Sequence, residues 1–102
     1  MRRKRCIVSN RARRDLNGIL NCIGKDDPES AVAFVDRLES TFKRLIRFPH
    51  LGRVREELGP GIRGYPIERY VVLYRTTDAG VEIVHVLHGA RDIETMFDKE
   101  RL

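Results

Sequence analysis

The residues best suited to chemistry lie near the C-terminal end of the sequence, where His85 and His88 are followed closely by Arg91. The two histidines are three positions apart in a predicted strand. Because strand side chains alternate between faces, the pair points to opposite sides and cannot chelate one metal from this strand alone. We expect His85 to be a structural histidine. His88, at the end of the strand and beside Arg91, is the better candidate for a functional role.

A second group of candidates is the arginine cluster Arg11, Arg13 and Arg14. These residues fall in the first turn of a predicted helix, where each cation opposes the positive end of the helix dipole at a cost of about 0.3–1 kcal/mol. Arg11 and Arg14 lie opposite the apolar stripe of that helix, and Asp15 offsets only part of the repulsion. Arginines at these positions destabilise the helix and add no packing in the core. We therefore predict a binding partner that requires positive charge here.

The charge of the chain is concentrated at its N-terminal end. The 102 residues carry a net charge of +5, with 20 Lys and Arg against 15 Asp and Glu. Seven of the basic groups and none of the acidic ones fall within residues 1–14. Such a cluster attracts an acidic partner, either nucleic acid or an acidic protein surface, or else serves only to solubilise the terminus.

Several functional classes lack their motifs. The sequence has no Gly-rich phosphate loop, no paired-cysteine or HExxH metal motif and no GxSxG elbow, so we expect no catalytic residue of those kinds, no metal and no cofactor. Cys6 and Cys22 are expected to be small reduced side chains, with a disulfide or redox switch as the alternative. No apolar run approaches the roughly 20 residues of a membrane span, and the basic N-terminus lacks the apolar region of a signal peptide. These features predict a cytoplasmic protein without membrane association.

The elements that position these residues follow from hydrophobic periodicity. In order, we predict a strand over 4–8, helices over 10–24 and 28–48, and strands over 62–67, 70–75 and 81–88. Ser9 or Asn10 caps the first helix, and Gly24 ends it. Asp27 and Pro28 start the second helix so soon afterwards that the two must form an antiparallel hairpin.

The remaining segments complete a small sheet. Residues 49–61 are predicted as a loop, and 62–67 as an edge strand because of its glycine and proline. The two later strands are apolar on both faces, which predicts central places in the sheet. Asp92 is predicted to cap a short C-terminal helix with Ile93, Met96 and Phe97 on its inner side. The prediction is a single α+β domain over 1–102, in the order β-α-α-β-β-β. An antiparallel α-helical hairpin packs on a small, mostly antiparallel sheet.

Five segments of the sequence resemble the ParE toxins of the ParE/RelE superfamily. They are residues 9–16, 48–53, 57–63, 70–75 and 84–92. Each segment is short, but together they occur in the same order as in the family, and the resemblance extends over roughly residues 6–97. The helical hairpin followed by a strand meander also suits that fold.

The resemblance implies the toxin component of a type II toxin–antitoxin system. Toxins of this type inhibit DNA gyrase by trapping its cleaved complex with DNA, and a ParD-like antitoxin neutralises them. Such a toxin works by binding and is not an enzyme, and it meets nucleic acid only indirectly, through gyrase or the antitoxin. The candidate target- or partner-binding residues are then Arg11, Arg13, Arg14, His88 and Arg91. An antitoxin is expected to add a strand at 62–67 or to dock on the helical hairpin.

Two alternatives stay open. The first is a RelE-like toxin that cleaves mRNA on the ribosome, which needs cations and a general base or acid. Arg63, Arg69, Arg75, Arg91 and His88 are candidates for those roles. Against this, such toxins usually place a Tyr or His near the C-terminus, whereas residues 89–102 contain neither. The second alternative is a member that titrates an antitoxin and has no activity on a target.

Overall fold

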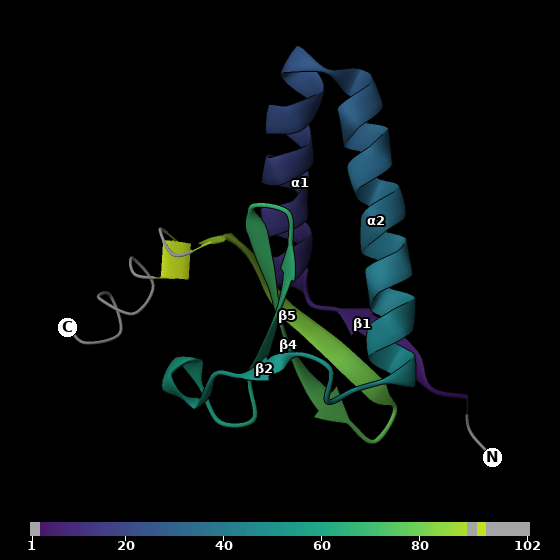
Figure 1. The fold of residues 1–102 in the computed structure, drawn as a ribbon, viewed down its shortest axis with the longest axis vertical. Coiled ribbons are helices and arrows are strands. Elements are labelled where there is room, and N and C mark those ends of the chain that lie inside the picture. The colour runs from purple at the N-terminus through teal and green to yellow at the C-terminus, as the bar shows by residue number, and fades with distance from the viewer. Residues whose placement is uncertain (1–2, 90–91, 94–102) are drawn as a thin grey trace.

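The computed structural model describes residues 3–89 and 92–93, which form a helical hairpin and a five-stranded sheet (Figure 1). The elements in order are β1 (Arg5–Val8), α1 (Asn10–Asp26), α2 (Pro28–Arg47), β2 (Arg53–Val54), the 3-10 turn η1 (Glu56–Leu58), β3 (Arg63–Ile67), β4 (Tyr70–Thr77) and β5 (Gly80–His88). The sheet order is β1-β5-β4-β3-β2, with β1 parallel to β5 and every other pair antiparallel. The predicted α+β class and the central places of β4 and β5 are confirmed.

The helical hairpin is tighter than the sequence suggested. Ser9 caps α1 as predicted, because its hydroxyl accepts a hydrogen bond from the Ala12 N–H at 3.0 Å. The prediction that Gly24 ends this helix was wrong, since α1 continues to Asp26. Gly24 instead faces α2, where an added Cβ would lie 3.7 Å from the Ala31 Cβ. Asp27 alone makes the reversal: it ends α1 in an extended conformation, and its carboxylate accepts the first N–H groups of α2.

The predicted strand over 62–67 corresponds to β3, and its first residues do not lie at an edge of the sheet, which corrects the sequence analysis. Residues 53–54, predicted as loop, form the short strand β2, and Arg53 and Val54 pair with Gly64 and Arg63 of β3. Pro66 is tolerated because β2 is too short to pair with that part of β3. The open edges of the sheet are therefore the outer sides of β1 and β2.

The last two strands are also longer than predicted, and only Asp78 and Ala79 separate them. Gly80 has a φ of 139°, and a Cβ at this position would overlap the Arg5 carbonyl of the neighbouring strand. Glycine is thus required where β1 meets β5, because any other side chain would push the parallel strands apart.

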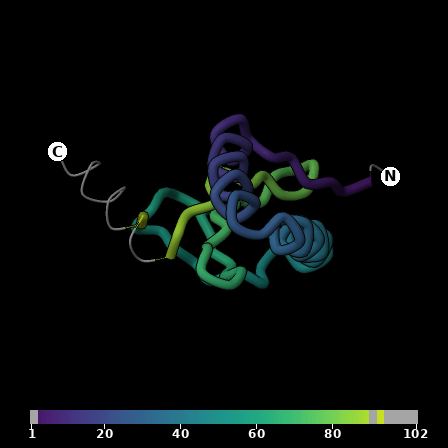
Figure 2. The backbone as a smooth tube through the Cα atoms, turned by 90° about the horizontal axis from the view of Figure 1, so that it is seen from above, coloured from purple at the N-terminus to yellow at the C-terminus, as the bar shows by residue number. Residues whose placement is uncertain are grey.

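Two apolar clusters hold the layers together. The main cluster lies between the helices and the sheet; its buried members are Ala12, Phe34, Leu38, Leu45, Ile67, Val72, Tyr74, Val81, Ile83 and Val86. A smaller cluster of Leu58, Leu73 and Ile93 covers the other face of the sheet. Figure 2 shows α1 and α2 side by side. Ile93 is buried as the predicted C-terminal helix requires, but Arg91, Met96 and Phe97 lie outside the described residues.

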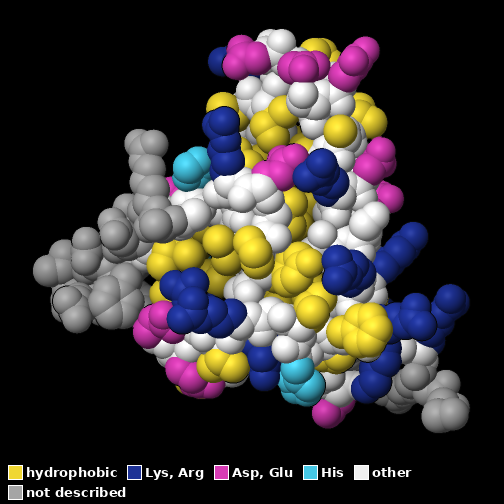
Figure 3. Space-filling view, in the orientation of Figure 1, with side chains coloured by type: hydrophobic (Ala, Val, Ile, Leu, Met, Phe, Trp, Pro, Cys, Tyr) yellow, Lys and Arg dark blue, Asp and Glu magenta, His cyan; other side chains and the backbone are white. Residues whose placement is uncertain are grey.

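Charge is distributed unevenly along the long axis of the molecule. On the face shown in Figure 3, acidic side chains gather at the tip of the helical hairpin, whereas Lys and Arg gather towards the opposite end. Neither α1 nor α2 is long and apolar enough to span a bilayer, and the same holds for all helical residues described.

Candidate functional site

The candidate site begins with the arginine cluster at the start of α1. Arg11, Arg13 and Arg14 are all exposed, and the first turn of α1 contains no acidic residue. The Asp15 carboxylate turns towards β5. There it accepts the Val86 N–H at 3.0 Å and lies 3.1 Å from Nδ1 of His85. The positive charge of this turn is therefore left largely uncompensated, as the sequence predicted.

The place of Asp15 follows from the sheet. β1 ends at Val8, so the edge of β5 beyond Ile83 has no strand beside it. Ser9 donates its hydroxyl to the Val84 carbonyl, and Asp15 accepts the Val86 N–H, so α1 satisfies backbone groups that β1 cannot reach. The side chain of His85 is held in the same contact and is mostly buried, with 19% of its surface exposed. His85 is thus a structural histidine.

A groove of about 390 Å³ lies between α1 and the end of β5. Its lining residues are Arg14, Asp15, Gly18, Ile19, Cys22, Tyr70, Val86, Leu87, His88 and Asp92. The fold thus brings Arg14 and His88 together, although 74 positions separate them in the sequence. Arg11 and Arg13 do not line this groove, and Arg91 lies outside the described residues.

His88 is exposed at the mouth of this groove. Its ring meets the Tyr70 ring edge-on, with centroids 5.4 Å apart, and Tyr70 in turn meets Phe34 of α2 at 5.3 Å. The His88 backbone N–H donates to the Asp92 carboxylate at 2.7 Å. Among the described residues no side chain hydrogen bonds to the His88 ring, so the ring has no carboxylate to orient it as a general base.

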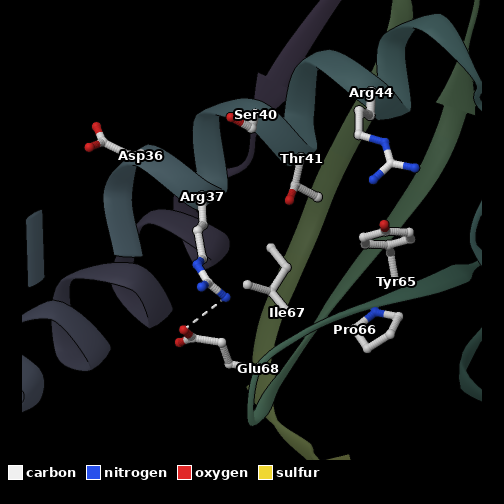
Figure 4. A pocket seen from close by; sticks show the side chains of 9 residues that line it. All are labelled: Asp36, Arg37, Ser40, Thr41, Arg44, Tyr65, Pro66, Ile67 and Glu68. Carbon is white, nitrogen blue, oxygen red and sulfur yellow. Dashed lines mark ion pairs between the residues drawn. The ribbon is translucent and has the colours of Figure 1, made fainter. Parts of the chain in front are cut away.

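A second groove, of about 430 Å³, lies between α2 and the β3–β4 turn (Figure 4). Its lining residues are Asp36, Arg37, Ser40, Thr41, Arg44, Tyr65, Pro66, Ile67 and Glu68. Arg37 reaches across it to Glu68 at 3.1 Å, and the Arg44 guanidinium lies 6.0 Å from the centre of the Tyr65 ring. The sequence analysis missed this groove. One sequence feature could have predicted it: Arg37 and Arg44 are seven positions apart and flank the apolar stripe of α2.

A third groove, of about 650 Å³, connects the other two. It shares Arg37 and Glu68 with the groove on α2 and Tyr70 with the groove on α1, and it is lined further by Ile23 and Phe34. The three grooves therefore form one continuous row along the helical hairpin. Its floor is aromatic and aliphatic, and its rims carry both signs of charge.

The arginines considered for nuclease chemistry are largely engaged elsewhere. Arg63 donates to the carbonyls of His50 and Gly52 at 3.3 and 2.8 Å. Arg75 pairs with Glu82 at 2.7 Å. These two side chains hold a loop and a strand pair, so they are not free to stabilise a phosphate. Arg69 is exposed in the β3–β4 turn.

Tyr74, the last tyrosine of the chain, is fully buried. Its hydroxyl donates to the Pro49 carbonyl and accepts the Gly52 N–H, both at 2.8 Å. Burial raises the pKa of the Tyr74 hydroxyl above its usual value. The residue therefore fixes the loop after α2 and is inaccessible to a substrate. No group of three potential metal ligands occurs within residues 3–89 and 92–93.

The fold is that of the small α+β toxins of type II toxin–antitoxin systems. The chain belongs to the ParE toxin family, because the family model described as "ParE toxin of type II toxin-antitoxin system, parDE" matches residues 6–93. The resemblance predicted from the sequence is confirmed.

Individual relatives agree with this assignment. The chain is 35% identical over 92 residues to "Toxin ParE3" of Caulobacter vibrioides, covering 85% of this chain and 92% of that one. It is 31% identical over 87 residues to "Toxin RelE1" of the same organism, covering 81% and 90%. A solved structure, "Chromosomal ParDE TA system from P. aeruginosa", superimposes with a TM-score of 0.71 over 84% of this chain and 96% of that chain. At 20% identity, that match shows a shared fold alone.

Proposed function

We propose that this toxin inhibits DNA gyrase by binding it and that a ParD-like antitoxin neutralises it in the cytoplasm. The observation that carries the proposal is the 35% identity to a toxin named ParE3, which extends over 92 residues. A non-enzymatic mode of action is supported by the side chains of the described residues. His88 has no carboxylate partner for its ring, and Tyr74 is buried.

The target-contacting surface is proposed to centre on Arg14 and His88, which share one groove. Arg11 and Arg13 extend the positive charge along the exposed first turn of α1, where no acidic residue neutralises it. Arg91 belongs to the same proposal by its place in the sequence, three residues after the end of β5. Cations that the fold does not use are available to bind an acidic partner.

The row of grooves is proposed as the place where the antitoxin docks. An amphipathic helix buries its apolar side in a groove and pairs its polar side with charges on the rim. Phe34 and Tyr70 supply such a floor, and Arg37, Glu68 and Arg44 supply rim charges. Strand addition along the whole of β3 is no longer proposed, because β2 already pairs with Arg63 and Gly64 and leaves only residues 65–67 of that edge open. Added salt should slow association if the antitoxin segment is acidic.

Gyrase poisoning is tested by incubating purified toxin with gyrase, ATP and supercoiled plasmid. The proposal expects linear plasmid after denaturation of the protein, in amounts that rise with toxin concentration. Pre-incubation of the toxin with the antitoxin encoded beside it should abolish the formation of linear plasmid. Unchanged supercoiling together with normal growth on expression of the toxin would instead support a member without target activity.

Cleavage of mRNA on the ribosome is kept as a second candidate because of the 31% identity to a toxin named RelE1. Of the residues considered for that chemistry, His88 is the one histidine, and it is exposed in the described part of the chain. Primer extension on mRNA from a translating extract should then show cuts at the ribosomal A site, lost in His88→Ala and Arg91→Ala. The gyrase proposal expects no such cuts.

A further inference from the structure

A second basic surface lies at the end of the molecule opposite the hairpin tip. We call it the basic end and define it by Arg3, Arg5, Lys43, Arg47 and Phe48, all of which are exposed. Figure 3 shows Lys and Arg gathered at the lower right, over the C-terminal end of α2 and the segment leading into β1. The two segments are neighbours, because α2 contacts β1, and Cys6 of β1 packs against the same main core cluster as Phe42 and Ile46 of α2.

Within residues 3–89 and 92–93, no ion pair neutralises the charge of the basic end. Residues 43–55 contain five Lys and Arg and no acidic residue. In the described part of the chain, none of the ion pairs involves Arg3, Arg5, Lys43 or Arg47. A cation in the last turn of α2 is favoured by the helix dipole, which accounts for Arg47. It does not account for Arg3 and Arg5, which belong to another element.

The basic end also exposes an aromatic ring. Phe48 follows α2 directly and is 53% exposed, and the Arg47 guanidinium lies 5.6 Å from its ring centre. Leu51 stands beside it, with its N–H bonded to the Phe48 carbonyl, and is 41% exposed. A large exposed ring among unpaired cations suits a ligand that carries both negative charge and flat apolar faces.

We propose that the basic end binds DNA directly. Arg3, Arg5, Lys43 and Arg47 contact backbone phosphates, and the Phe48 ring stacks on an unpaired base. Nucleic acid is favoured over an acidic protein segment because it alone supplies phosphates and planar rings at regular spacing. The inference goes beyond the proposed function, in which the toxin meets DNA only indirectly, through gyrase or the antitoxin. The surface is separate from the groove of Arg14 and His88, since none of its residues lines that groove.

The test measures fluorescence anisotropy of labelled single-stranded and duplex oligonucleotides with the purified full chain, over a range of salt concentrations. Phosphate contacts give a slope of log K against log salt of about −0.7 per contact for single strands and about −0.9 for duplex. Lys43→Gln with Arg47→Gln should therefore reduce the steepness of the duplex slope by about 1.8. Phe48→Ala should weaken single-strand binding by about 5- to 150-fold and leave the slope unchanged.

The matched control is Arg11→Gln with Arg14→Gln, which removes the same charge from the other basic surface. The proposal expects this pair to leave DNA affinity within twofold of the parent protein. An equal loss in both double variants would mean that net charge alone attracts DNA, and it would overturn the proposal. Displacement of DNA by polyglutamate as effectively as by unlabelled DNA would assign the surface to acidic protein instead. Because gyrase is absent from this measurement, its result is independent of the gyrase assay.

Discussion

The Asp15 carboxylate of α1 accepts the Val86 N–H of β5 at 3.0 Å, joining residues 71 positions apart in the sequence. The same carboxylate lies 3.1 Å from His85. It takes the place of a strand that would otherwise satisfy this edge of β5. The contact also engages the carboxylate that follows the arginine cluster in the sequence, and no ion pair of Asp15 with Arg11 or Arg14 is found in the described residues.

Replacing Asp15 tests this role. Asp15→Ala leaves the Val86 N–H without its acceptor and should lower the free energy of unfolding by about 1–3 kcal/mol. Asp15→Asn keeps an acceptor oxygen and should recover part of the loss. Urea denaturation followed by circular dichroism measures both. The control is Asp36→Ala, an exposed carboxylate on α2, which should change stability by less than about 0.5 kcal/mol.

Neutralising the arginine cluster should separate binding from folding. Arg11→Gln with Arg14→Gln relieves repulsion at the positive end of α1, so the melting temperature should stay the same or rise. Binding of the proposed target should weaken, measured as the toxin concentration that gives half-maximal linear plasmid. Arg75→Gln serves as a control, because Arg75 of β4 pairs with Glu82 of β5 and does not belong to the arginine cluster. If the double variant binds the target as well as the parent protein does, the arginine cluster is not part of the target-contacting surface.

Tyr74→Phe should lower the free energy of unfolding although it removes a single oxygen atom. The Tyr74 hydroxyl satisfies both the Gly52 N–H and the Pro49 carbonyl, so its loss leaves buried polar groups unpaired, at a cost of about 1–3 kcal/mol. Gly52→Ala should be worse, since an added Cβ would lie 2.6 Å from the Tyr74 ring. Thermal denaturation checks both variants. Tyr65→Phe is the comparison, because no hydrogen bond of the Tyr65 hydroxyl is found in the described residues and little change is expected.

Protonation of the Asp27 carboxylate at low pH should destabilise the helical hairpin. A hydrogen bond from the Ser30 hydroxyl, followed by backbone N–H bonds, lowers the pKa of the Asp27 carboxyl below its usual value. A carboxyl with a lowered folded-state pKa stabilises the fold above its unfolded-state pKa of about 4, and that contribution is lost as the pH falls through the folded-state value. Asp27→Asn can still cap α2 but does not titrate. The free energy of unfolding, measured between pH 7 and pH 2, should therefore decrease less at low pH in the variant than in the parent protein.

The two cysteines should differ in reactivity. Burial raises the pKa of the Cys6 thiol to about 11, so almost no thiolate is present at neutral pH. Cys22 is exposed and lines the groove shared by Arg14 and His88. A maleimide should therefore label Cys22 first, as counted by mass spectrometry of digests, and bound antitoxin should slow this labelling if it covers the groove. Faster labelling of Cys6 would contradict the packing of β1 against the core.

Much of the fold was predictable because it depends on local patterns. The stripes of α1 and α2, the Asp27 cap and the apolar runs of β4 and β5 each specify their element within a few residues. β2 was missed because two residues carry no periodicity, and its pairing depends on β3. Gly24 was misread because a glycine inside a helix looks the same in sequence as one that ends a helix.

The site was predicted less completely than the fold. Arg14 and His88 were singled out, but their shared groove depends on how α1 crosses the end of β5. The groove lined by Arg37 and Glu68 was missed, because it is formed by side chains from separate elements and leaves no single motif. The basic end was predicted only in part, since Arg3 and Arg5 fall in the N-terminal basic cluster, whereas Lys43 and Arg47 belong to α2, which contacts β1 only in the folded chain.

The parallel pairing of β1 with β5 also has a consequence for synthesis on the ribosome. The Ser9 hydroxyl bonds to the Val84 carbonyl, 75 positions later, so the first strand must wait for the last one to emerge. Closing so long a loop is slow and leaves apolar surface uncovered in the meantime. A nascent chain halted before Gly80 has an unpaired first strand, and the surface that joins α1 to the sheet is missing. The complete sheet can therefore form only after β5 has left the ribosome.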